Sequence, residues 1–104
     1  MSNGDAQIKV YVSSMSPNAN TVCQQNKIEQ VLEAKKVSFI KIDIASNPDY
    51  KDEMRAIMGD ERGLAPQICN GNEYCGNYET FADAIELGTL FEFLKLPSPV
   101  QEQS

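Results

Sequence analysis

The stretch APQICNGNEYCGN, residues 65–77, decides the fold of this chain. At its centre, Asn70-Gly71 is a strong signal for a tight turn, because both residue types accept the positive φ angles that hairpin turns require. The residues on either side suit strands, so the sequence predicts a hairpin formed by residues 66–69 and 73–75. Asn77, just after the hairpin, is a residue type that caps helices. We therefore expect two antiparallel strands followed directly by a helix.

The residues before the hairpin predict two strands and two helices. Residues 8–12 and 37–44 alternate in the manner of strands. Between them, residues 21–36 place apolar side chains at helical spacing. A second helix is expected to begin at Asn47-Pro48 and to end at Gly59, because Asn caps a helix, proline suits its first position, and glycine suits the residue after it. The N-terminal half is therefore predicted to be β-α-β-α.

The complete predicted order is β-α-β-α-β-β-α, with an additional short apolar helix over residues 90–96. A βαβ start requires a parallel pair of strands, and the hairpin adds an antiparallel pair. The consistent solution is a four-stranded mixed sheet with helices on both faces, which is a three-layer α/β sandwich. We expect residues 7–96 to form this domain, residues 1–6 to be disordered and residues 97–104 to form a mobile tail.

Charge and composition exclude several classes of function. The 104-residue chain has a formal net charge of −6 and no basic stripe, so we expect no nucleic-acid partner. No apolar run approaches the length of about 18 residues that a membrane span needs, and no secretory leader is apparent. We therefore expect no membrane insertion and a cytoplasmic location, with access to the nucleus. The absence of histidine excludes Ser-His and Cys-His nucleophile pairs and Cys₂His₂ zinc sites.

The three cysteines are Cys23, Cys69 and Cys75. Their odd number and the lack of an export signal indicate reduced thiols rather than a disulfide framework. In a hairpin with a two-residue turn, Cys69 lies opposite Tyr74 and Ile68 lies opposite Cys75, so the two thiols face opposite sides of the sheet. We expect Cys69 to be a core thiol and Cys23 to be partly buried on its helix.

Several segments together resemble one protein family. Residues Ala65–Ile68, Asn70-Gly71 and Tyr74–Glu79 resemble the part of glutaredoxins in which a cis-proline precedes the third strand and a glycine-containing turn opens the next helix. With Asp52–Ala56 and Glu92–Leu96 added, the chain is similar to the SH3-domain-binding glutamic-acid-rich-like family, which is related to glutaredoxins. The similarity covers nearly the whole chain.

The resemblance implies a thioredoxin-like, glutaredoxin-type fold with a cis peptide bond before Pro66. It also implies a protein that modulates glutaredoxin activity or serves as an adaptor, with partners among glutaredoxin-pathway or signalling proteins. SH3 domains are poor candidates for partners at this loop, because residues 63–66 contain a single proline and lack the PxxP spacing.

The redox dithiol of a glutaredoxin is missing from this chain. Ser16-Pro17-Asn18-Ala19 falls roughly where Cys-Pro-x-Cys would be, and a serine hydroxyl without a base cannot exchange a disulfide. We therefore predict no catalytic residue, and a protein that binds or modulates rather than an enzyme.

The opposite wall of the glutaredoxin-type groove is expected to remain. No cofactor is required for a binding role. The alternatives are a glutathione-binding protein, an iron–sulfur protein in which Cys75 from two chains holds the cluster, and a weak monothiol oxidoreductase using Cys75 or Cys23. A position near a helix N-terminus favours a lowered pKa for the Cys75 thiol. A purely structural role for Cys75 and Pro66 also stays open. The candidate binding residues are Ser16, Ala65, Pro66, Cys75, Gly76, Asn77 and Tyr78.

Overall fold

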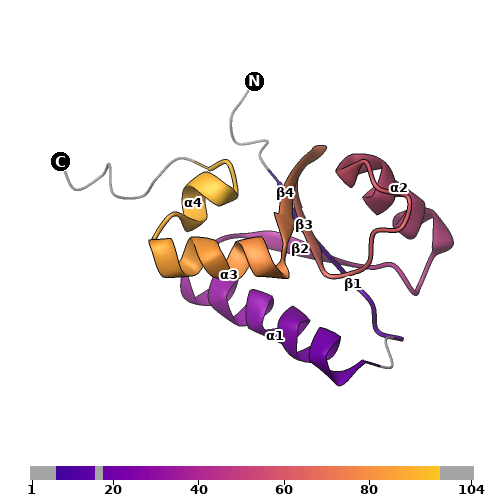
Figure 1. Cartoon of the computed structure of the whole chain (residues 1–104), viewed down its shortest axis with the longest axis horizontal. Coiled ribbons are helices and arrows are strands. Elements are labelled where there is room, and N and C mark those ends of the chain that lie inside the picture. Colours follow the sequence, from indigo (N-terminus) through magenta and orange to yellow (C-terminus); the bar gives the residue numbers. More distant parts are fainter. Residues whose placement is uncertain (1–6, 16–17, 97–104) are drawn as a thin grey trace.

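A four-stranded mixed sheet forms the centre of the computed structural model, which describes residues 7–15 and 18–96 (Figure 1). The element order confirms the sequence prediction. Ser16 and the two ends, residues 1–6 and 97–104, for which disorder and mobility were predicted, lie outside the described residues. The elements are β1 (Ile8–Val12), α1 (Ala19–Ala34), β2 (Phe39–Asp43), α2 (Pro48–Met58), β3 (Gln67–Asn70), β4 (Glu73–Asn77), α3 (Tyr78–Leu87) and α4 (Leu90–Phe93).

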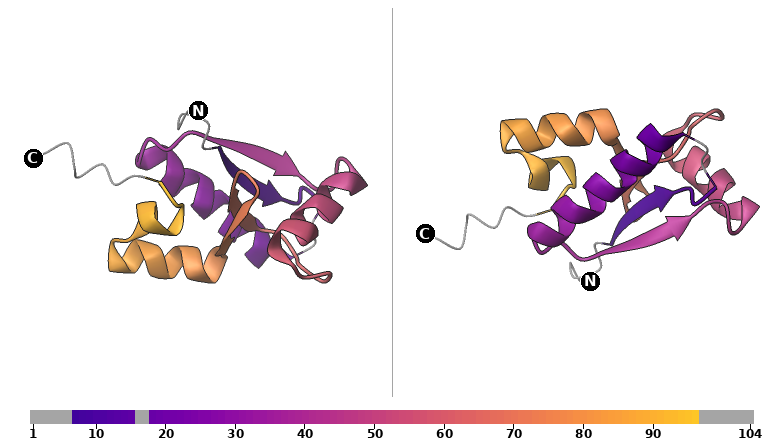
Figure 2. Two further views of the ribbon diagram at one scale, coloured as in Figure 1. Left: turned by 90° about the horizontal axis from the view of Figure 1, so that it is seen from above. Right: turned by 90° about the horizontal axis from the view of Figure 1, so that it is seen from below.

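The strands follow the order β2-β1-β3-β4 across the sheet. β1 and β2 run parallel, with Ile8 beside Phe39, whereas β1 pairs antiparallel with β3 and β3 pairs antiparallel with β4. α2 lies on one side of the sheet, and α1 and α3 lie on the other side (Figure 2). This arrangement is the three-layer sandwich that the βαβ start and the hairpin predict.

Two hydrophobic cores lie on the two faces of the sheet. The larger core joins β1 and β3 to α1, α3 and α4 through side chains such as Leu32, Phe81 and Leu94. The smaller core lies under α2 and contains Tyr11, Met54 and Cys69. Fully burying one such side chain contributes about 1.5–3 kcal/mol, so the larger core supplies most of the apolar stabilisation.

Side-chain caps fix where the helices begin. The Asn47 side chain accepts a hydrogen bond from the backbone N–H of Asp49, and the Asn77 side chain forms a capping box with Thr80, as the sequence predicts for these two asparagines. α1 begins at Ala19, two residues earlier than expected. Its N-cap is Asn18, whose side chain accepts the N–H of Asn20.

The β3–β4 hairpin contains a bulge that the sequence did not predict. Cys69 lies opposite Tyr74, as expected, but Ile68 pairs with Gly76 instead of Cys75. Cys75 is therefore the extra residue of the bulge. The Ala65–Pro66 peptide bond that leads into β3 is cis, as the resemblance implied. Among the described residues, no helix is long and apolar enough to cross a membrane.

Candidate functional site

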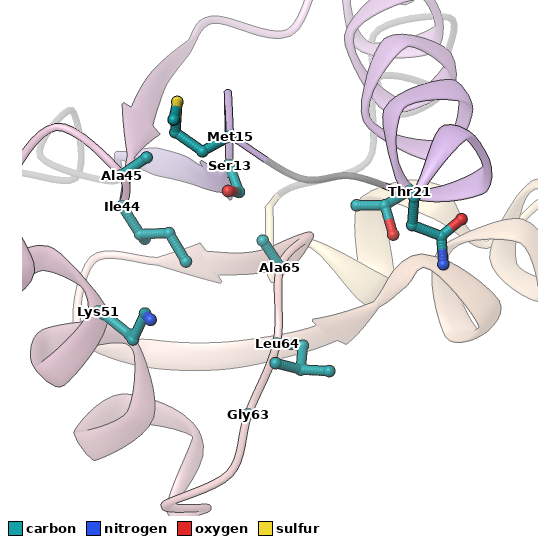
Figure 3. Close-up of a pocket in the computed structure, with 10 residues that line it drawn as sticks. Ser13, Met15, Thr21, Ile44, Ala45, Lys51, Gly63, Leu64 and Ala65 are labelled. Carbon is teal, nitrogen blue, oxygen red and sulfur yellow. The ribbon is translucent and has the colours of Figure 1, made fainter.

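A cavity of about 460 Å³ opens beyond the carboxyl ends of the parallel strands β1 and β2 (Figure 3). In α/β sheets this end of the parallel strands is the usual place for a ligand, because the loops that follow the strands converge there. The described residues that line this groove come from the β1–α1 loop, the start of α1, the β2–α2 loop, α2 and the loop before β3. They are Ser13, Met15, Asn18, Thr21, Ile44, Ala45, Lys51, Gly63, Leu64 and Ala65.

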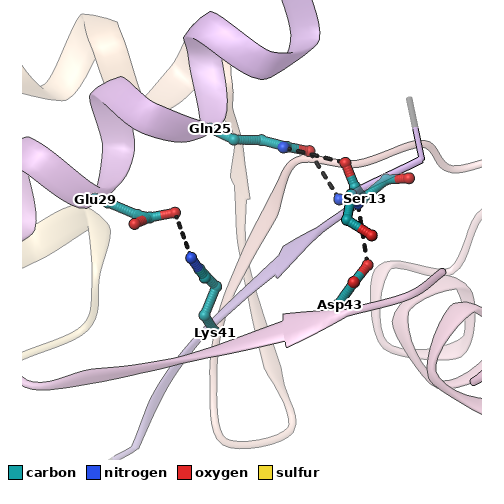
Figure 4. Close-up of polar contacts among 6 residues, drawn as sticks. Ser13, Gln25, Glu29, Lys41 and Asp43 are labelled. Carbon is teal, nitrogen blue, oxygen red and sulfur yellow. Dashed lines mark hydrogen bonds and ion pairs between the residues drawn. The ribbon is translucent and has the colours of Figure 1, made fainter. Parts of the chain in front are cut away.

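Two polar side chains hold the beginning of the β1–α1 loop (Figure 4). The buried Gln25 of α1 accepts the N–H of Ser13 at 2.9 Å and donates its own amide to the Ser13 carbonyl at 3.3 Å. Asp43, at the end of β2, accepts the N–H groups of Ser14 at 3.1 Å and of Ala45 at 3.0 Å. One carboxylate therefore joins two of the loops that form the groove.

The hydrogen bonds to Asp43 also determine its ionisation. The hydrogen bonds from Ser14 have the largest effect: they favour the carboxylate and lower the pKa of Asp43. The hydrogen bond from the Ala45 backbone and the positive charge of Lys41 lower it further. Desolvation opposes this shift but does not reverse it. Asp43 is therefore ionised at neutral pH, and it joins two loops of the groove without lining the groove itself.

The opposite wall, residues 63–65, is also held on both sides. Arg55 of α2 donates from Nε to the Gly63 carbonyl at 3.0 Å. Gln67 donates to the Leu64 carbonyl at 2.6 Å, and its Oε1 accepts from the Tyr74 hydroxyl at 2.6 Å. The Leu64 side chain is nevertheless 71% exposed. A large apolar side chain held outward by a fixed backbone is typical of a contact surface for another molecule.

A second cavity of about 210 Å³ lies on the other side of this loop. It brings together four of the residues predicted from the sequence, namely Ala65, Pro66, Asn77 and Tyr78. Its other lining residues are Gln24, Leu64, Gln67 and Glu79. Leu64 and Ala65 line both cavities, so the loop before the cis-proline separates two adjoining parts of one surface.

Two predicted residues, Cys75 and Gly76, do not line either cavity. Gly76 is buried where a Cβ atom would meet Thr80 and Phe93, so its role is to allow close packing. Cys75 packs against the larger core. Ser16 lies outside the described residues.

Burial changes the chemistry expected of two thiols. Desolvation raises the pKa of Cys75 to about 11 and that of Cys69 to about 12. The expectation of a lowered pKa at Cys75 is therefore wrong, because loss of solvent outweighs the nearby helix start. Cys69 is a core thiol, as predicted, whereas Cys23 is exposed rather than partly buried.

The thiol positions bear on the iron–sulfur alternative. A cluster shared between two chains needs a sulfur atom at the surface, whereas Cys75 is half-buried and packs against the larger core. Within the described part of the chain, no group of three Cys, Asp or Glu residues could hold a metal ion. The smaller cavity also fits the carboxylates of glutathione poorly, because Glu79 is its only charged lining residue within the described chain.

Of the described residues that line the larger groove, sequence reasoning predicted only Ala65; those it missed include Met15, Lys51 and Leu64. Met15 and Leu64 are 76% and 71% exposed. Their signal was a large apolar residue within a polar loop, which is unusual but not specific. No feature of the sequence around Lys51 indicated that it lines the groove, because the local sequence does not show that this part of α2 faces the β1–α1 loop.

The model of the family described as SH3-binding, glutamic acid-rich protein matches residues 6–97 of the chain. The chain belongs to this family. The match spans all described elements, from β1 to α4, and includes both walls of the groove. Family membership thus agrees with the resemblance seen in the hairpin and its flanking segments.

Solved structures show the same fold in more distant proteins. This member of the SH3-binding, glutamic acid-rich family is similar to the C. albicans actin interacting protein Aip5, with a TM-score of 0.72 and 19% identity over 86% of this chain and 88% of the other. It is also similar to the holo form of glutaredoxin C1 from Populus tremula x tremuloides, with a TM-score of 0.63 and 16% identity over 85% and 82% of the two chains. The fold is therefore thioredoxin-like, of the glutaredoxin type.

Proposed function

We propose that this protein is a non-catalytic thioredoxin-fold module that binds an extended segment of a partner protein in the groove between Met15 and Leu64. In this role it serves as an adaptor or as a modulator of a glutaredoxin. The observation that carries the proposal is the outward Leu64 side chain on a backbone held by Arg55 and Gln67. Rigid loops lose little conformational entropy on binding, so they suit recognition.

The thiols support binding rather than catalysis. The sequence has no Cys-x-x-Cys, and the raised pKa values of Cys69 and Cys75 leave those two thiols almost entirely protonated near pH 7. A turnover assay for glutathione-dependent disulfide reduction should therefore show no activity. Turnover that disappears in the Cys75→Ser or Cys23→Ser variant would instead establish the monothiol enzyme.

A direct test of the groove uses two exposed leucines. Leu64 is 71% exposed in the groove wall, and Leu87 is 75% exposed at the end of α3, outside both cavities. Peptides selected from a random display library on the wild-type chain should lose binding to Leu64→Ser and keep binding to Leu87→Ser. Equal binding to all three proteins would contradict a site in the groove.

Two further measurements address the partner. The name of Aip5 makes actin the first protein to test, with the same pair of leucine variants. Addition of this chain to a glutaredoxin assay tests the modulator role. Glutathione is the alternative small ligand, and an amide NMR titration would detect it through shifts at Ala65, Asn77 and Tyr78 in the smaller cavity.

A further inference from the structure

We infer that the partner segment bound in the groove is acidic, with an Asp or Glu carboxylate at Lys51 next to an apolar side chain that packs between Met15, Ile44 and Leu64. This inference rests on the proposed function and names the class of segment that the groove prefers. It follows from the charges and the apolar contacts of the described lining residues.

The charge in the groove is opposite to that of the protein as a whole. The chain has a formal net charge of −6, yet the one charged side chain among the described lining residues is the ammonium group of Lys51 (Figure 3). The acidic Asp49 and Asp52 belong to the same helix but do not line the groove. The groove therefore presents a positive charge within an otherwise acidic protein.

The positive charge of Lys51 is available to a ligand. The ion pairs between described residues join Lys9 to Glu53 and Lys41 to Glu29, and neither includes Lys51. The carboxylate of Asp43, which joins two loops of the groove but does not line it, accepts the N–H groups of Ser14 and Ala45. Lys51 is also exposed, so its ammonium group can reach an incoming carboxylate without first leaving a partner in the described chain.

The remaining lining explains why a peptide fits better than a phosphate group or a nucleic acid. Phosphate recognition depends on several cations, commonly arginines, whereas this lining offers a single lysine. Met15, Ile44 and Leu64 provide apolar contacts beside it, and Ser13 and Thr21 provide hydroxyl groups for a backbone. An apolar residue beside an acidic residue in an extended chain satisfies all of these contacts.

The test is a peptide-display selection on the wild-type chain and on two charge-reversed variants. Lys51→Glu reverses the charge in the groove. Lys27→Glu makes the same change in net charge at an exposed position of α1 that does not line either cavity. We expect the wild type and Lys27→Glu to enrich peptides with Asp or Glu beside a large apolar residue. Peptides selected on Lys51→Glu should no longer be enriched in Asp or Glu and should be enriched in Lys or Arg instead.

Affinities of one enriched peptide and its Gln analogue make the test quantitative. The Lys51→Gln change should weaken the binding of the acidic peptide about fivefold, as expected for the loss of a partly exposed ion pair. The affinity of the Gln analogue should stay unchanged. A higher salt concentration should weaken the binding of the acidic peptide to the wild type but not that of the Gln analogue.

The outcomes separate this inference from the proposed function. If selected peptides need Leu64 but show no acidic preference, the groove binds peptides and the inference about Lys51 is wrong. If no selected peptide depends on Leu64, both fail. If acidic peptides bind Lys51→Glu as tightly as the wild type, the carboxylate lies elsewhere and the inference is again wrong.

Discussion

The side-chain amide of Gln25 makes two hydrogen bonds to the backbone of Ser13, one to its N–H and one to its carbonyl. Ser13 is the first residue after β1, and the Gln25 side chain bonds its backbone groups as a neighbouring strand would. The two groups would otherwise be without these partners at a partly buried position. The position of the β1–α1 loop therefore depends on a side chain from the middle of α1.

Replacing Gln25 with leucine tests this dependence. Leucine cannot form either hydrogen bond, so we expect the free energy of unfolding to fall by about 1–3 kcal/mol in urea denaturation. Gln30→Leu, at an exposed position of the same helix, is the control and should change it by less than about 0.5 kcal/mol. Equal effects of the two changes would show that the Ser13 contacts do not matter for stability.

Asp43 should make stability depend on pH in the acid range. Its pKa is lower in the folded protein than in the unfolded chain, so its contribution is complete above the unfolded value near 4 and is lost as the pH falls through the folded value. Asn in the Asp43→Asn variant can still accept hydrogen bonds but does not titrate. We expect the wild type to be more stable than Asp43→Asn at pH 7, with a difference that shrinks below pH 4. A difference that is constant from pH 7 to pH 3 would contradict this account.

The three thiols should differ strongly in their reaction with iodoacetamide. At pH 8 a thiol with a pKa of about 11 is ionised in about one molecule in a thousand, so Cys75 should react slowly and should speed up about tenfold with each pH unit. Cys69 should react only when the protein unfolds, whereas the exposed Cys23 should be labelled first. Mass spectrometry of the labelled peptides gives each rate. Fast labelling of Cys75 at pH 7 would contradict the raised pKa and would support the alternative of a weak monothiol oxidoreductase that uses Cys75.

Replacing Gly76 with alanine should destabilise the protein more than the same change at Gly71, a glycine in an open turn. A Cβ atom there would overlap Thr80, which belongs to the α3 capping box, and would meet Phe93. Gly71→Ala is the control, since its φ of 61° is unfavourable for alanine but no atom lies near its added methyl group. We expect about 1–2 kcal/mol of destabilisation for Gly71→Ala and a larger loss for Gly76→Ala. Thermal denaturation of the two variants makes the comparison.

Local chemistry made most of the fold predictable from the sequence. Asn47 and Asn77 cap their helices because an asparagine side chain satisfies N–H groups that lie only two or three residues away. The hairpin turn was predictable for a similar reason, since Gly71 accepts its φ of 61°. The two turn residues are Gly71-Asn72, one position later than the Asn70-Gly71 signal, because Asn70 still pairs with Glu73 as the last residue of β3. Such signals need no knowledge of distant parts of the chain.

The bulge and the groove could not be predicted in this way. The Gly76–Ile68 pairing depends on how the hairpin continues into α3, so periodicity alone assigned Cys75 to the wrong partner. Lys51 and Met15 come together only when α2 and the β1–α1 loop are placed on the sheet. The thiol pKa values likewise depend on burial by elements that are distant in sequence.

The larger groove is built almost entirely from loop residues and helix starts, whereas the two cores lie along the sheet. Of its described lining residues, Ile44 belongs to the smaller core and Ala65 packs against that core, whereas Met15, Lys51 and Leu64 belong to neither core. Substitutions at Met15, Lys51 or Leu64 can therefore accumulate during evolution without disturbing the packing of the domain. Gene duplicates of such a protein can diverge in the partners that they recognise while the scaffold stays the same.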